Sequence, residues 1–172
     1  MTDGNGDESG VPERVRRAAR DHDALGDPAG GGFPVTSTPF DGRIAVDERD
    51  DGRLAFDVTV RVPTLSAVAV DEVADVVDEG WYDTFERRVA DIGAVTEGDH
   101  DLSPATRRAG EEAVVEASLT DLNERRGVND AVAVVDYVEG TYVQGVVPGY
   151  EYTDPVAGLI DRARAAGGSG DY

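Results

Sequence analysis

The clearest pattern in the chain is a strict alternation of apolar and mostly polar residues over positions 54–62. Such a period of two is typical of a strand with one buried face. Ile44 and Val46 show the same alternation just before the turn-rich stretch DERDDG. The pattern therefore predicts a β-hairpin over residues 43–62. The apolar positions of its second strand are Leu54, Phe56, Val58, Val60 and Val62.

Helical spacing of apolar residues appears in four other regions. It predicts helices over about 11–23 and 130–147, a broken helix over 66–92, and a last short helix that begins at Pro155. Pro12 and Pro155 suit the first turn of a helix, and Asn129 or Asp130 offers an N-cap.

The remaining segments predict further strands. Residues 33–40 are expected to be extended, and 93–97 and 112–119 are weak strand candidates joined by a long polar tip. The order is then α-β-β-β-α-β-β-α plus a short C-terminal helix. This order predicts an α+β fold in which an antiparallel sheet of about five strands carries helices packed on one face.

Domain boundaries follow from composition. Residues 1–10 and 167–172 are polar and glycine-rich, which predicts two disordered tails, the first of them acidic, around a single domain over 11–166. The N-terminal region lacks the pattern of a targeting signal, and the longest apolar stretch contains Asp136 and Glu139. We therefore expect a cytoplasmic protein with no membrane partner.

Charge changes the picture more than any motif. The formal net charge is −20, with 36 Asp+Glu against 16 cations that are all arginine. Arginine without lysine and a large acidic excess are typical of cytoplasmic proteins of salt-accumulating archaea, where concentrated salt screens the self-repulsion. The same charge repels phosphate backbones, so nucleic acid is not an expected partner.

Two absent residue types exclude much chemistry. Without lysine the chain has no Schiff-base or phosphate-loop amine, and without cysteine it has no disulfide, thiol catalysis or cysteine zinc site. We expect no cofactor, no metal site and no catalytic residue set. His22 and His100 each lie beside aspartates, but aspartate is so frequent here that this adjacency is expected by chance.

One turn superficially suits calcium. Residues 47–52 place Asp47, Asp51 and Gly52 as in a calcium-binding loop. Arg49 and Val58 occupy positions at which that loop requires oxygen ligands. A tight hairpin turn explains Asp51 and Gly52 instead.

The element order resembles the secretion-chaperone fold and its relatives among small bacterial sensory-regulation proteins. In this fold a sheet packs on helices and dimers are common. At the level of sequence the chain is similar to a haloarchaeal family of uncharacterised proteins, a domain of unknown function. The segments that carry this second resemblance are FPVTSTPFDGRI, VRVPTLSAVAVDEVADVVDEGWYDTFERRV and VVDYVEGTYVQGVVPGYEY. It implies a salt-adapted cytoplasmic origin and no particular activity.

A tyrosine-rich segment is the first candidate binding surface. Tyrosine combines apolar area with a polar tip, as interfaces favour, although the same residues could close the edge of the core. The candidate residues are Tyr137, Tyr142, Gln144, Tyr150 and Tyr152. A second candidate, for docking an acidic partner or phosphate, is the basic island formed by Arg14, Arg16, Arg17 and Arg20. The same arginines could instead pair with the acidic surface of the chain itself.

Together these features favour a non-enzymatic protein-interaction module, chaperone- or adaptor-like and homodimeric, that binds a protein partner. The alternative is a small-molecule-binding protein or carboxylate-based enzyme with a pocket between the sheet and helix 130–147. A pocket with converging polar groups would favour the alternative, and an exposed apolar patch would favour the interaction module.

Overall fold

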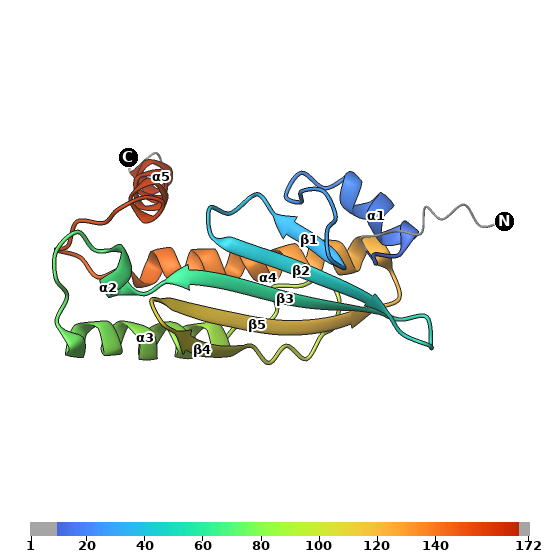
Figure 1. Ribbon diagram of the computed structural model, residues 1–172, viewed down its shortest axis with the longest axis horizontal. Coiled ribbons are helices and arrows are strands. Elements are labelled where there is room, and N and C mark those ends of the chain that lie inside the picture. Colours follow the sequence, from blue (N-terminus) through green and yellow to red (C-terminus); the bar gives the residue numbers. More distant parts are fainter. Residues whose placement is uncertain (1–9, 169–172) are drawn as a thin grey trace.

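The computed structural model describes residues 10–168 and shows an antiparallel sheet accompanied by helices (Figure 1). The predicted α+β class and element order are confirmed, except that two separate helices occupy the central helical region. The helices are α1 (Glu13–Arg20), α2 (Leu65–Val68), α3 (Asp75–Ala90), α4 (Glu124–Gly145) and α5 (Val156–Gly168). The strands are β1 (Gly32–Val35), β2 (Asp41–Glu48), β3 (Leu54–Pro63), β4 (Ala105–Ala109) and β5 (Glu112–Asp121).

The sheet has the strand order β1-β2-β3-β5-β4, and every neighbouring pair is antiparallel. The predicted hairpin is formed by β2 and β3. Its turn is closed by a 2.8 Å hydrogen bond from the Arg49 amide to the Arg53 carbonyl, and Gly52 there has a positive φ of 85°. β4 pairs only with residues 112–116 of β5, so residues 117–121 of β5 have no strand on their outer side.

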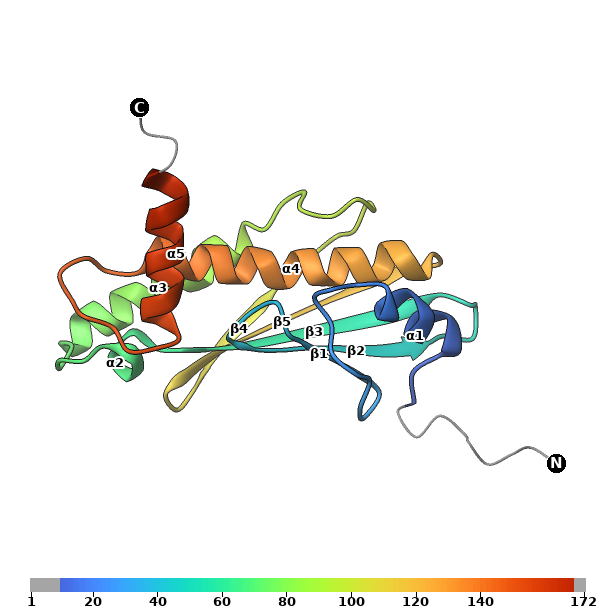
Figure 2. The same cartoon turned by 90° about the horizontal axis from the view of Figure 1, so that it is seen from above.

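The core lies between the sheet and α4, which runs across one face of the sheet (Figure 2). The alternating apolar residues of β3 are all buried against it, as their spacing predicts. The opposite side of the strand is polar: Asp57 there is exposed and accepts a 2.6 Å hydrogen bond from Ser118 on β5. The sheet is therefore covered by helices on one face.

α4 approaches the sheet very closely at Gly127. A Cβ atom at this position would stand 2.3 Å from Cε2 of Phe56, far inside van der Waals contact. Glycine is thus required here by space rather than by backbone conformation, since Gly127 has no positive φ.

The strand expected over residues 93–97 is wrong, and so is the long hairpin tip. The hairpin partner of β5 is β4, and a two-residue turn at Gly110 and Glu111 joins the two strands. Gly110 has a positive φ of 63°, which suits glycine in such a turn. The amides of residues 97 and 98 instead donate hydrogen bonds to a helix side chain.

Two helix boundaries also differ from the prediction. α4 begins six residues earlier than Asn129–Asp130 suggests, because Asn123 is its N-cap and accepts a 2.8 Å hydrogen bond from the Arg126 amide. The central helical region was expected to resume after Gly80, but its break lies at residues 69–74 and α3 continues through Gly80. At the break Ala69 pairs with Tyr152, and the Val70 amide donates a 2.8 Å hydrogen bond to the Glu151 carbonyl.

The tails expected over 1–10 and 167–172 lie largely outside the described residues. Residues 167 and 168 are described, and they form the end of α5. Between residues 10 and 168, no helix combines the length and the apolar character needed to cross a membrane.

A buried carboxylate ties α3 to its neighbours. Asp78 accepts a 2.9 Å hydrogen bond from the Ser66 amide in α2 and another from Arg108 in β4. Burial alone would raise the pKa of Asp78, but these hydrogen bonds and the charge of Arg108 outweigh it and the pKa is lowered. Arg108 also lies over the ring of Tyr82, 5.1 Å from its centroid.

Replacing Asp78 with asparagine should lower the free energy of unfolding at pH 7 by about 1–3 kcal/mol, since it removes charge-assisted hydrogen bonds at a buried position. The pKa of Asp78 lies lower in the folded than in the unfolded chain, so its ionisation stabilises the fold above about pH 4. That stability is lost as the pH falls through the folded-state pKa.

Urea unfolding of the wild type and of Asp78→Asn, at pH 7 and at about pH 3, measures how much Asp78 stabilises the fold at each pH. The difference in free energy of unfolding between the wild type and Asp78→Asn should be smaller at the lower pH. Asp83→Asn, which changes an exposed residue on the same helix, should have little effect at either pH. A gap that stays constant with pH would contradict the assigned role of Asp78.

Candidate metal centre

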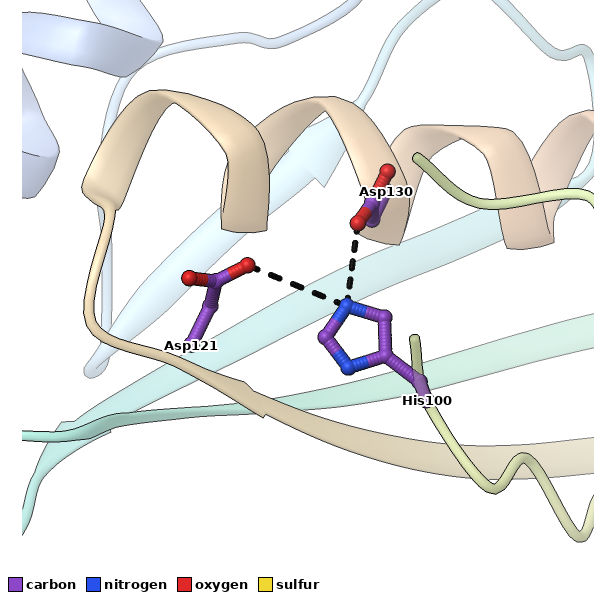
Figure 3. Close-up of side chains that lie close together, drawn as sticks. All are labelled: His100, Asp121 and Asp130. Carbon is purple, nitrogen blue, oxygen red and sulfur yellow. Dashed lines mark hydrogen bonds and ion pairs between the residues drawn. The ribbon is translucent and has the colours of Figure 1, made fainter. Parts of the chain in front are cut away.

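Three side chains from separate segments meet at one end of the sheet (Figure 3). Asp121 is the last residue of β5 and follows Leu119 and Ala117 on the side of the strand that faces the core. Asp130 lies in α4, and His100 lies in the loop between α3 and β4. Both carboxylates are almost fully buried, with side chains 2% exposed, and the His100 side chain is 9% exposed.

Both carboxylates approach the same ring nitrogen. His100 Nε2 lies 3.0 Å from Asp130 Oδ2 and 3.8 Å from Asp121 Oδ2. The shorter distance is a hydrogen bond, and the longer one exceeds hydrogen-bond length. The other ring nitrogen, Nδ1, points away from both carboxylates (Figure 3).

Backbone amides hold Asp130 in place. The amide of Glu97 donates to its Oδ1 at 2.9 Å, and the amide of Gly98 donates to its Oδ2 at 3.0 Å. A Cβ atom at position 98 would stand 2.5 Å from His100 Nε2, so only glycine fits between the amide and the ring. Asp130 thus fixes the loop that carries His100.

Asp121 is held by a guanidinium. Arg126 donates from Nε to Oδ2 at 2.7 Å and from Nη2 to Oδ1 at 2.8 Å, and the Asn123 amide adds a 2.9 Å bond to Oδ1. The Arg126 hydrogen bond is the main reason that the pKa of Asp121 is lowered, against the opposing effect of burial. Asp121 is therefore an oriented carboxylate that stays ionised near neutral pH.

An open cleft of about 720 Å³ adjoins the cluster. It lies beside residues 118–121 of β5, in the part of the strand that β4 leaves uncovered. His100 and Asp121 line it, together with three arginines: Arg49, Arg53 and Arg126. The buried cluster is thus connected to solvent through a polar space large enough for a small molecule.

The arrangement can hold a metal ion. His100 Nε2 and one carboxylate oxygen each from Asp121 and Asp130 all lie within 4.8 Å of one another. Ligand atoms bound at about 2.0–2.2 Å to zinc stand about 3–3.5 Å apart, so small side-chain movements would close the set around an ion. One imidazole and two carboxylates form a set of ligands that suits Zn²⁺, Mn²⁺ or Fe²⁺. Ca²⁺ and Mg²⁺ instead prefer sites in which all the ligands are oxygens.

Adjacency along the chain did not reveal this cluster. The closest partner of His100 is 30 residues away in the sequence, and the neighbouring Asp99 and Asp101 are exposed. The sequence predicts Asp130 as a possible helix cap, but the residue lies nearly two turns inside α4. An aspartate among the apolar positions of a helix can indicate a buried carboxylate, but it does not identify the partners of Asp130.

The predicted tyrosine surface is only partly at the surface. Tyr142 is fully buried, packs edge-on against Phe40 at 4.9 Å, and donates a 2.9 Å hydrogen bond to the Pro63 carbonyl. Its assignment to a binding surface is therefore wrong, because an apolar ring on the sheet-facing side of α4 belongs to the core. Gln144 is exposed.

The other three tyrosines are partly buried. Tyr137 donates a 2.6 Å hydrogen bond to the Arg88 carbonyl, and Tyr152 donates to the Val147 carbonyl. Tyr150 and Tyr152 line a cleft of about 350 Å³ between the end of α4 and α5. The structure thus places Tyr150 and Tyr152 together and Tyr137 apart from them.

The arginines of α1 divide into two kinds. Arg14 donates a 2.8 Å hydrogen bond to the Gly52 carbonyl and lies 3.8 Å from Glu124, so it ties α1 to the β2–β3 turn and to α4. Arg16 pairs with Glu13 in its own helix. Arg17 and Arg20 are exposed. Half of the basic island therefore takes part in contacts within the chain.

Comparison with known proteins identifies a family whose function is unknown. No curated protein and no solved structure matches the chain. A family model does match residues 20–162, from the end of α1 into α5, and this range includes the whole His100 cluster and its cleft. The match confirms the expected domain of unknown function: the chain belongs to the Family of unknown function (DUF5813).

Proposed function

We propose that this protein binds a divalent transition-metal ion through His100, Asp121 and Asp130 and presents it to a small polar ligand in the adjoining cleft. The convergence of two buried carboxylates on one imidazole nitrogen carries the proposal. It is a form of the small-molecule alternative expected from the sequence, with the pocket at the beginning of α4 instead of along its length.

The chemistry of Nε2 supports an ion at this point. The nitrogen has one position for a proton and can donate it along only one line, yet oxygens of two carboxylates face it. A divalent ion in place of that proton would interact with both oxygens at once. The imidazole would then carry its proton on Nδ1.

The surroundings of the three residues also suit a metal site. Ligating carboxylates in metal sites are commonly oriented by further hydrogen bonds, which here come from Arg126 and from the amides of residues 97 and 98. Three protein ligands leave at least one coordination position for water or a bound molecule. Since His100 and Asp121 line the cleft, that position would be accessible from it.

The same contacts could instead serve only to fasten the loop to α4, and titration with Mn²⁺ separates the two roles. The wild type should bind one Mn²⁺ saturably in calorimetry or electron paramagnetic resonance. His100→Gln and Asp130→Asn should weaken binding by more than about 100-fold, since losing an outer-shell partner alone costs about 10- to 100-fold.

Asp101→Asn is the matched control, because it removes a cleft carboxylate beside His100 that belongs to no part of the cluster. It should leave Mn²⁺ binding within a few fold of the wild type. Melting temperatures identify any variant that fails to fold. If Asp130→Asn fails to fold, His100→Gln, whose change lies on the loop, still tests the metal site. Absence of saturable binding of Mn²⁺ and Zn²⁺ by the folded wild type would overturn the proposal.

We also propose a second candidate function, the chaperone- or adaptor-like interaction module. The cleft between α4 and α5 supports it, because Val147, Tyr150 and Tyr152 line that cleft with apolar area and hydroxyl tips. The rest of the described surface supports it less. Within residues 10–168 the exposed large hydrophobic side chains are Val70, Val76 and Leu122, which lie on three different segments.

The native setting that we propose is the salt-rich cytoplasm of an archaeon. The net charge of −20 and the use of arginine alone support it, because concentrated salt would screen a surface that otherwise repels itself. The homodimer expected from the secretion-chaperone resemblance stays a prediction. Binding experiments should therefore use the lowest KCl concentration that keeps the protein folded. A measurement of the molecular mass in solution under the same conditions tests the homodimer.

A further inference from the structure

Three arginines line the cleft beside the His100 cluster. Arg49 and Arg53 come from the β2–β3 turn, and Arg126 comes from the first turn of α4. The Arg53 side chain is 51% exposed and lies 3.7 Å from Asp51. Arg126 is 48% exposed, and its bonds to Asp121 use Nε and Nη2, so Nη1 remains for another acceptor. These guanidiniums can therefore reach a molecule in the cleft.

Guanidinium groups from two elements favour an oxyanion. Their planar donors match the oxygens of phosphate or carboxylate in paired hydrogen bonds. Arginines on different segments suit a group with oxygens in several directions, as phosphate has. A flat carboxylate presents only two oxygens, and both lie in one plane.

The same cleft is nonetheless acidic. Five carboxylates line it against the three arginines, and the buried Asp130 lies behind them. The acidic lining residues are Asp57, Glu97, Asp99, Asp101 and Asp121. An anion entering the cleft without a metal ion would meet an excess of negative charge, added to the net charge of −20 of the whole chain.

A divalent ion changes this balance. Two positive charges at His100, Asp121 and Asp130 would cancel most of the local acidic excess and leave the arginines able to attract an anion. A metal ion with an open coordination position would also accept a phosphate oxygen directly. Metal and arginines would then hold different oxygens of one group.

We infer that the cleft binds the phosphate group of a small molecule, and that it does so only when a divalent ion occupies His100, Asp121 and Asp130. In this arrangement the ion holds one phosphate oxygen, while Arg49 and Arg53 of the β2–β3 turn and Arg126 of α4 hold others. The inference rests on the proposed metal function and adds the chemical class of the ligand. The strongly negative surface favours a small phosphate compound over a nucleic-acid backbone.

Calorimetric titration with inorganic phosphate, with and without saturating Mn²⁺, tests the inference. Phosphate should bind saturably to the Mn²⁺-loaded protein and at least about 10-fold more weakly to the metal-free protein. Sodium acetate, titrated in the same way, should bind at least about 10-fold more weakly than phosphate. This arm separates phosphate from carboxylate ligands.

The double variant Arg49→Gln/Arg53→Gln should keep Mn²⁺ affinity within a few fold of the wild type and lose about 10-fold or more in phosphate affinity. The matched control Arg87→Gln/Arg107→Gln removes the same charge from exposed positions that do not line the cleft, and it should bind phosphate as the wild type does.

The outcomes distinguish the two proposals. If Mn²⁺ does not bind the wild type, the proposed metal function fails. The ligand inference alone is overturned if Mn²⁺ binds but phosphate binds equally well without it. It is likewise overturned if acetate matches phosphate, or if the Arg49/Arg53 variant binds phosphate as tightly as the control variant.

Discussion

Phe56→Ala should lower the free energy of unfolding by about 3–5 kcal/mol, the range typical of deleting a buried phenylalanine ring. Phe56 is fully buried on β3, and its ring contacts the backbone of α4 at Gly127. The helix and sheet are held apart there by this ring, so truncation leaves a cavity that neighbouring side chains cannot fill without moving α4.

Urea unfolding followed by circular dichroism measures the loss. Thr59→Ala is the control: Thr59 lies on the other side of the same strand and is only partly buried, so its change should cost less than about 1.5 kcal/mol. Equal losses at the two positions would mean that the outer face of the sheet is as tightly packed as the inner one.

Gly127→Ala should destabilise the protein by about 1–3 kcal/mol, although alanine is the better helix former. The added methyl group would clash with Cε2 of Phe56 at 2.3 Å, on a helix that also packs on β5. Gly140→Ala is the matched control in the same helix, because a Cβ there meets nothing within 4 Å. It should be neutral or stabilise by up to about 1 kcal/mol.

The clash also predicts a coupling that a double variant reveals. In the Phe56→Ala background the ring is absent, so Gly127→Ala should become neutral or stabilising as the methyl group enters the cavity. Thermal or urea unfolding of the four proteins closes this cycle. Additive losses from the two changes would contradict direct contact between Phe56 and position 127.

The success and failure of sequence reasoning have physical causes. Residues 54–62 were assigned correctly because a half-buried central strand must alternate, whereas β4 was missed because none of its five residues is buried. An edge strand such as Ala105–Ala109, with Arg107 and Arg108 at its centre, has the composition of a polar loop. The start of α4 was misplaced because Asn123 and Asn129 both have capping chemistry.

The candidate site was unpredictable for a different reason. His100, Asp121 and Asp130 come from a loop, a strand end and a helix, and only the packing of β5, α4 and the loop brings them together. In a chain with 36 acidic residues, no spacing separates these two aspartates from the rest. Asp121 and Asp130 differ from most of the others in being buried, as Asp78 also is, and burial follows from the fold as a whole.

The close contact at Gly127 has a consequence for the site itself. Asp130 lies three residues further along α4, so both residues are on the helix face that meets the sheet. The Phe56 ring therefore limits how closely this part of α4, which includes Asp130, can approach the sheet. If the proposed metal ion binds here, its affinity and selectivity would depend on small differences in the distances between ligand atoms, and therefore in part on this apolar contact. A change in the size of residue 56 would then alter the proposed metal site from within the core, although His100, Asp121 and Asp130 stay unchanged.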